Sequence, residues 1–103
     1  MDMMADNKNK EPYINMVRRV LDAHGERWYL NGERHREDGP AVVWADGSKF
    51  WYIDDKRHRL YGLAVEYANG RKWFFIAGVE YTEEDYTIKI KEIKYNRTID
   101  KNC

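Results

Sequence analysis

The fold is decided by residues 27–72, which read RWYLNGERHREDGPAVVWADGSK from Arg27 to Lys49 and FWYIDDKRHRLYGLAVEYANGRK from Phe50 to Lys72. These two 23-residue copies are identical at 11 positions. A third, partial copy begins at Trp73 and ends near Tyr81. Self-similarity at a fixed period predicts an array in which each unit buries its apolar face against the next.

Each unit begins with an alternating run that is typical of a half-buried strand. Trp28 and Leu30 share one face of the first run, and the opposite face becomes more apolar from one unit to the next. Each run ends at a candidate hairpin turn, namely Asn31-Gly32, Asp54-Asp55 or Ala77-Gly78. We therefore predict a mainly β fold, an antiparallel meander of β-hairpin repeats with a 23-residue period.

Two further strands are expected in each unit. A short basic strand follows the hairpin turn, at residues 34–36 and 57–59, and a third strand occupies residues 41–44 and 64–67. Gly39 and Gly62 occupy the same place between them, which predicts a backbone conformation closed to other residues.

The ends of the chain differ from the repeats. Residues 1–11 are polar and are expected to form a flexible arm. Residues 12–81 form the predicted repeat domain, in which either a strand at Val17–Asp22 or a helix over residues 12–23 precedes the first full unit. Residues 82–103 form a helix and tail.

The predicted C-terminal helix has an acidic start. Thr82 is its expected N-cap, and acidic residues follow in the first turn. Tyr86, Ile90 and Ile93 lie on one helical stripe, although Tyr86 and Ile90 also fit a strand alternation through residue 88. We favour a capping helix over Phe74 and Phe75 at the open end of the sheet.

Composition excludes several classes of protein. The 18 basic and 18 acidic side chains cancel, so no global field draws the chain to nucleic acid or an anionic membrane. A single cysteine, Cys103, fits a reducing compartment and is expected to be an exposed thiol without a role. No apolar run is long enough to span a bilayer, and the first ten residues lack the apolar centre of a signal peptide. We expect a soluble cytoplasmic protein without a membrane partner.

The motifs resemble a known repeat family. Residues 28–32 and 35–41 are similar to the "WYxNG…HRxDGPA" repeat of MORN-like small phage-type proteins, and Gly78–Tyr86 resembles the way such arrays finish. The second unit departs from the motif at Asp55 and at residues 60–64. The resemblance implies a β-hairpin repeat protein without a known active site, acting in the cytoplasm of a host cell.

Catalysis is not expected. The histidines are His24, His35 and His58, and the last two occupy one repeat position, where they are predicted to bond a turn or to stack on an aromatic ring. No metal-ligand cluster, nucleophile motif or phosphate-binding glycine loop is present, so no cofactor is expected.

Two surfaces are candidate binding sites. The first is an aromatic face suited to a protein partner, or to a second copy in a homodimer, and contains Phe50, Tyr52, Trp73 and Phe75. The second is a basic ladder for a nucleotide or single-stranded nucleic acid, and contains Arg34, His35, Arg36, Arg57, His58 and Arg59. Nearby acids leave open the reading that the ladder is a solvated strand face.

These surfaces support two hypotheses. The first is a non-enzymatic protein-interaction module, which the phage-type resemblance would make an inhibitor or modulator of a host protein or defence system. The alternative is an anion-binding protein that sequesters a nucleotide or single-stranded nucleic acid.

Overall fold

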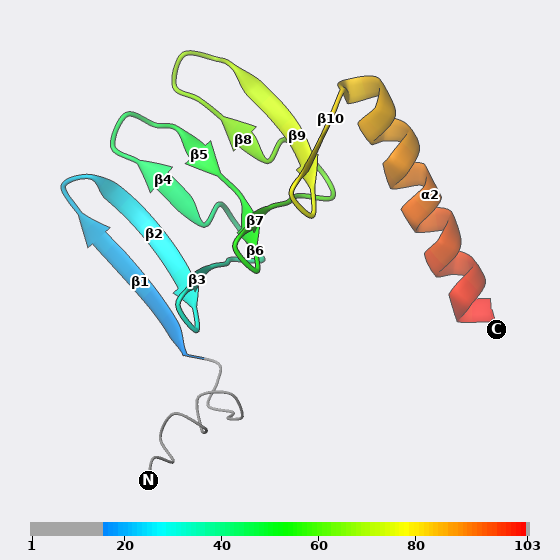
Figure 1. Ribbon diagram of the computed structural model, residues 1–103, viewed down its shortest axis with the longest axis horizontal. Helices are drawn as coiled ribbons and strands as arrows, with labels where there is room; N and C mark the ends of the chain where they lie inside the picture. Colours follow the sequence, from blue (N-terminus) through cyan, green and yellow to red (C-terminus); the bar gives the residue numbers. More distant parts are fainter. Residues whose placement is uncertain (1–15, 103) are drawn as a thin grey trace, which may run out of the picture.

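Hairpin-connected antiparallel strands make up most of the computed structural model, which describes residues 16–102 and their side chains up to residue 96 (Figure 1). The strands are β1 (Val17–Asp22), β2 (Gly25–Leu30), β3 (Glu33–Arg34), β4 (Val42–Trp44), β5 (Lys49–Phe50), β6 (Tyr52–Ile53), β7 (Lys56–Arg57), β8 (Val65–Glu66), β9 (Lys72–Ile76) and β10 (Val79–Tyr81). A C-terminal helix, α2 (Glu83–Asn102), follows them.

The main sheet follows the chain almost in sequence order. Its strands are arranged β1-β2-β4-β5-β8-β9-β10, with β3 paired to β2, while β6 and β7 form a separate two-stranded hairpin. Every pairing is antiparallel. The predicted mainly β, antiparallel hairpin fold with a C-terminal helix is therefore confirmed.

Before the first unit, the sequence left a strand and a helix as alternatives. Residues 17–22 form a strand, β1. This strand pairs with β2 along its whole length, from Val17 opposite Leu30 to Asp22 opposite Gly25. The prediction of a helix is therefore wrong for residues 17–22. Residues 12–15, the arm at 1–11, and Cys103 lie outside the described residues.

All three predicted hairpin turns have positive φ at both central residues. The angles are 52° and 87° at Asn31-Gly32, 52° and 66° at Asp54-Asp55, and 50° and 86° at Ala77-Gly78. This is the backbone of a type I′ turn, whose twist matches that of the strands it joins. The Asp-Asp and Ala-Gly pairs therefore adopt the same turn as the stronger Asn-Gly signal.

The basic strand after each hairpin is shorter than predicted. β3 ends at Arg34 and β7 at Arg57. The next amides, His35 N and His58 N, still donate to their own units, at Trp28 O (3.2 Å) and Trp51 O (3.0 Å), and the amides after them bond the following unit. Arg36 N donates to Tyr52 O (3.0 Å), and Arg59 N donates to Phe75 O (3.1 Å). The two donors are 23 residues apart in the sequence, and so are the two acceptors.

The backbone conformation predicted for the two repeated glycines is present at one of them. Gly62 has a φ of +145°, as predicted, but Gly39 lies outside the positive-φ region. Both glycines also pack against an arginine. A Cβ on Gly39 would lie 2.9 Å from Arg36 Cζ, and one on Gly62 would lie 2.7 Å from Arg59 Cζ. The shared requirement is close approach of a guanidinium to the backbone.

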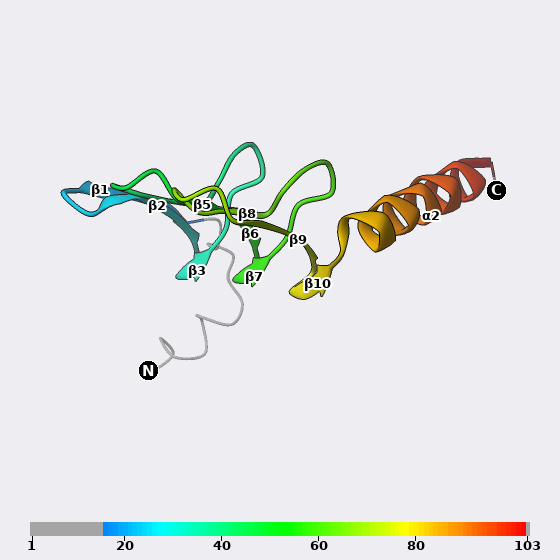
Figure 2. The same cartoon turned by 90° about the horizontal axis from the view of Figure 1, so that it is seen from above.

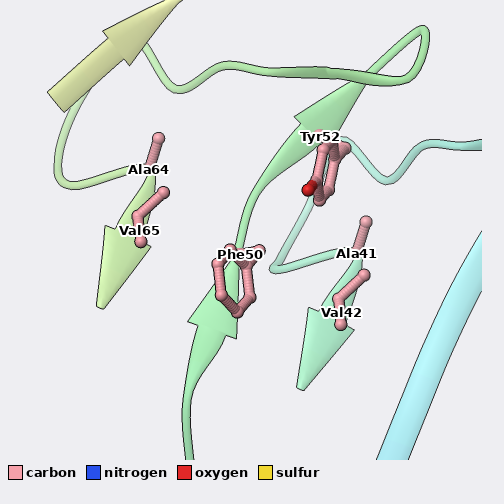
Figure 3. Packing of buried hydrophobic residues seen from close by; sticks show 6 residues of the cluster. All are labelled: Ala41, Val42, Phe50, Tyr52, Ala64 and Val65. Carbon is pink, nitrogen blue, oxygen red and sulfur yellow. The ribbon is translucent and has the colours of Figure 1, made fainter. Parts of the chain in front are cut away.

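The core is a narrow strip across the middle of the sheet (Figure 3). Phe50 of β5 lies between Val42 of β4 and Val65 of β8, its partners in register. Phe50 is 7 % exposed and Val65 is 1 % exposed. Further packing comes from partly buried aromatic residues, namely Trp28, Trp51, Trp73 and Phe75.

The sheet has two unlike faces (Figure 2). The connections between β3 and β4 and between β7 and β8 rise on one side, which we call the loop face, and their Arg36 and Arg59 cover Trp28 and Trp51. The hairpins that contain β3, β7 and β10 bend toward the other side, which we call the open face. Neither a described strand nor a described helix crosses it (Figure 1).

The helix begins as predicted. Asp85 N donates to Thr82 Oγ1 (3.1 Å), so Thr82 is the N-cap, and acids at 83–85 occupy the first turn. No helix in the described part of the chain is long and apolar enough to cross a membrane.

Tyr86 attaches this helix to the last strands. Its ring stacks on Phe74 of β9 with centroids 4.4 Å apart. Its hydroxyl donates to Arg59 O (2.5 Å) and accepts from Gly62 N (3.1 Å). The predicted cover over Phe74 is thus present, whereas Phe75 points to the opposite face because neighbouring strand residues alternate.

Tyr86→Phe tests this attachment. The variant keeps the ring but leaves the Arg59 carbonyl and the Gly62 amide without their partner, so we expect the free energy of unfolding to fall by about 1–3 kcal/mol. Urea denaturation measures this change. Tyr95→Phe removes the hydroxyl of an exposed tyrosine on the same helix and should have no effect; equal losses in the two variants would contradict the assignment.

Candidate binding face

The open face is defined by the register of the strands. Arg27 lies opposite Val42, Val42 opposite Phe50, Phe50 opposite Val65, and Val65 opposite Trp73. Alternation along each strand adds the remaining members. Strands β2 to β9 and the residues beside them contribute Arg27, Tyr29, Arg34, Val42, Trp44, Phe50, Tyr52, Arg57, Val65, Tyr67, Trp73 and Phe75 to the open face, and the register adds Arg18 and Val20 of β1 and Glu80 of β10.

Aromatic rings on this face form a continuous row. Tyr67 packs edge-on against Phe50 and against Trp73, with centroids 5.4 Å apart in each pair. Tyr67 is 38 % exposed and Trp44 is 39 % exposed. The row therefore has rings held in fixed orientation by their neighbours and partly open to solvent.

Two of the predicted protein-binding residues are not exposed. Phe50 and Tyr52 are both 7 % exposed and belong to the core, while Trp73 and Phe75 are half-buried. Phe50 is covered because Val42 and Val65 flank it and Tyr67 packs on its ring. Tyr52 lies under the Arg34 guanidinium, 4.2 Å from its ring centroid. The expectation that all four present an exposed face is wrong for this pair.

Arginines are interleaved with the rings. Arg27 lies over Trp44 at 5.5 Å and bonds Asp22 at 2.6 Å. Arg34 donates from Nε to Asp55 Oδ1 (2.7 Å) and from a terminal nitrogen to the Tyr52 hydroxyl (3.1 Å). The hydrogen bond from Arg27 lowers the pKa of Asp22 to about 2, and that from Arg34 lowers the pKa of Asp55. Both acids are therefore ionised at neutral pH.

A cavity of about 280 Å³ lies on this face. Phe50, Tyr52 and Val42 contribute to its apolar lining, and the guanidinium-bearing side chains are Arg27, Arg34 and Arg57. This combination of apolar surface with a few charged groups is typical of a binding site.

The predicted basic ladder is divided between the two faces. Arg34 and Arg57 line the open-face cavity, whereas Arg36 and Arg59 lie over Trp28 and Trp51 on the loop face, at 4.4 Å and 3.8 Å. The chain leaves the strand direction after Arg34 and after Arg57, so residues two apart no longer share a face. A single anion-binding surface made by all six residues is therefore not formed.

The two repeated histidines bond hairpin turns, as one of the sequence readings predicted. His35 Nδ1 accepts from Asp54 N (3.0 Å), and His58 Nδ1 accepts from Ala77 N (2.9 Å). Each ring thus joins its own unit to the turn of the next. His35 Nε2 also lies 3.1 Å from Glu37 Oε2.

His58 should make the stability depend on pH. Burial disfavours the charged ring and lowers the pKa of His58 from its usual 6.5. The unfolded chain therefore binds the proton more readily, so the free energy of unfolding is fully retained above about pH 6.5 and falls as the pH drops below that value. Urea denaturation at a series of pH values measures this loss.

His58→Asn provides the decisive comparison, because an amide oxygen can accept from Ala77 N without titrating. We expect this variant to lose much of the dependence. An unchanged pH profile in His58→Asn would contradict the prediction.

Sequence reasoning missed Trp44, Tyr67 and Arg27 as members of this face. The signal was available for the first two, because they occupy the same repeat position and alternate with the buried Val42 and Val65. Arg27 could not be found from the repeat, since the second copy has Phe50 at that position.

Residues that could hold a metal ion do not cluster within the described chain, where no group of three or more His, Cys, Asp or Glu side chains gathers. Comparison with protein-family models, curated proteins and solved structures gave no match to this chain.

Proposed function

We propose that this protein is a non-enzymatic protein-interaction module and that the open face is its binding surface. The observation that carries the proposal is a row of fixed, partly exposed aromatic rings interleaved with arginines, on a sheet face that no second layer of the described residues covers. Tryptophan, tyrosine and arginine are the residues that dominate the binding energy of protein interfaces.

Preorganisation supports the same assignment. Tyr67 is held between Phe50 and Trp73, and Trp44 is held under Arg27. A partner that covers these rings would therefore order few side chains on binding, which reduces the entropy cost of association.

The loop face is a weaker candidate because its tryptophans are already covered. Arg36 and Arg59 lie over Trp28 and Trp51, and their guanidinium groups also bond the carbonyls of Pro40 (3.3 Å) and Leu63 (3.1 Å). A partner could reach these tryptophans only if the two arginines moved away, and the folded chain would then lose their ring contacts and hydrogen bonds.

The resemblance to phage-type proteins directs the search for a partner to proteins of a bacterial host. The homodimer expected from the sequence would bury the same open face. Sedimentation of the purified chain over a range of concentrations separates this case from a hetero-complex, because only self-association depends on the concentration of the chain alone.

Truncation of the exposed rings tests the proposal. Trp44→Ala and Tyr67→Ala, each in the full chain, should lose the partner or weaken a purified complex by about tenfold or more, because truncation of a hot spot typically costs about 2 kcal/mol or more. Quantitative capture from host lysate, followed by calorimetry with the purified partner, gives the measurement.

Tyr61→Ala and Val79→Ala are matched controls. Both residues are exposed and apolar, at 59 % and 55 %, and neither belongs to the open face. They should bind like the wild type. A partner that is lost with the controls but retained with Trp44→Ala and Tyr67→Ala would overturn the proposed surface, and circular dichroism excludes unfolding as the cause.

A further inference from the structure

Arg34 and Arg57 occupy the same place in successive units but have different surroundings. Arg34 has two side-chain acceptors, the Asp55 carboxylate at 2.7 Å and the Tyr52 hydroxyl at 3.1 Å. Both acceptors come from the hairpin of the next unit. In the first unit, the guanidinium at this repeat position therefore donates to one carboxylate and one hydroxyl on the open face.

The equivalent acceptors are missing around Arg57. The residues 23 positions after Tyr52 and Asp55 are Phe75 and Gly78, and neither has a side-chain acceptor. Backbone geometry is otherwise the same, because Asp55 N donates to Arg34 O (2.9 Å) and Gly78 N donates to Arg57 O (2.8 Å). The hairpin is therefore in place without the groups that would bond the guanidinium.

The Arg57 side chain is held between two rings. Its Cζ lies 5.4 Å from the centroids of Phe50 and Phe75, and the residue is half-buried. Within residues 16–96, no carboxylate or hydroxyl bonds the Arg57 guanidinium, and Glu80, which lies opposite Phe75 in β10, makes no ion pair with it. Arg57 thus lines the cavity as a half-buried cation without a counter-ion among these residues.

We propose that Arg57 is an anion-recognition residue of the open face and that it binds a carboxylate side chain of the protein partner. This inference rests on the proposed function and names the chemistry of the partner. The bound carboxylate would take the place at Arg57 that Asp55 takes at Arg34. A planar guanidinium matches a carboxylate, and a charge-assisted hydrogen bond of this kind is stronger than a neutral one.

The charge of the cavity favours one carboxylate over a nucleotide. Asp22 pairs with Arg27 and Asp55 pairs with Arg34, so two of its three cations already have counter-ions. Among the described residues, Arg57 is the cation of this lining that has no paired carboxylate, since Glu80 on the neighbouring strand makes no ion pair with it. A polyphosphate would bring several negative charges next to the two carboxylates, whereas one acidic side chain completes the balance.

Gly78→Asp provides a test that keeps Arg57 itself. The substitution reproduces the Asp55 position, and a Cβ on Gly78 meets nothing closer than 3.7 Å, at Lys56. Gly78 has a φ of +86°, which aspartate and asparagine tolerate better than other residues. The new carboxylate should occupy Arg57 from within the chain. Gly78→Asn is the matched control, because it has the same shape without the charge.

The probes are a fluorescein-labelled peptide of alternating tyrosine and glutamate, its counterpart with glutamine in place of glutamate, and ATP. We expect the glutamate peptide to bind and to shift the Arg57 Nε–H resonance in NMR spectra, and the glutamine peptide and ATP to leave it unmoved. Gly78→Asp and Arg57→Gln should weaken glutamate-peptide binding by about tenfold or more, and Gly78→Asn should not.

Several results would overturn the site: equal binding of the two peptides, a shift caused by ATP alone, no shift with millimolar glutamate peptide, or unchanged binding in Gly78→Asp. The last result, combined with a captured partner that still requires Trp44 and Tyr67, would reject the anion site while leaving the proposed interaction face standing. Loss of dependence on those rings would instead reject the face.

Discussion

The structure depends on backbone hydrogen bonds between successive units. They join the hairpin of one unit to the end of the hairpin in the preceding unit and to the residues just after it. Arg36 N donates to Tyr52 O, and Asp55 N donates to Arg34 O. These bonds place the β6–β7 hairpin beside β3, although the two share no ladder in the main sheet. They also bring the Tyr52 ring under Arg34 and the Asp54 amide to His35. Both the aromatic–arginine contacts and the histidine bonds therefore follow from one backbone docking.

Guanidinium groups do in this protein what a second layer of apolar residues does in a sandwich. A sheet normally buries one face against another element. Here Arg36 and Arg59 cover the tryptophans of the loop face, and Arg34 covers Tyr52 on the other. An arginine shields a ring with its flat surface while its edge still donates hydrogen bonds. The same device that stabilises a thin fold thus leaves directional donors at its surface, which is the property that a recognition surface requires.

The sequence predicts the hairpins well because their turns are local: Asn31-Gly32 specifies a type I′ turn, and its repeat partners adopt the same one. Thr82 and the acids after it likewise specify a helix start. The exposure of Phe50 and Tyr52 could not be predicted from the sequence. Alternation places them on one face, but it does not show that Val42 and Val65 enclose Phe50. The division of the basic ladder between the two faces could not be predicted either, because it depends on where the chain leaves β3. That Phe75 and Gly78 give Arg57 no counterparts of the acceptors around Arg34 can be recognised in the sequence only once Arg34 and Asp55 are known to meet.

The docking of each hairpin on its immediate predecessor has a consequence for how such a surface grows. The bonds from Tyr52 O to Arg36 and from Phe75 O to Arg59 involve adjacent units only. The extent of the open face is therefore determined by the number of units and not by any one loop. Under the proposed function, duplication of one such unit would lengthen the surface by one increment, so the length of the binding surface could change separately from the specificity of its individual positions.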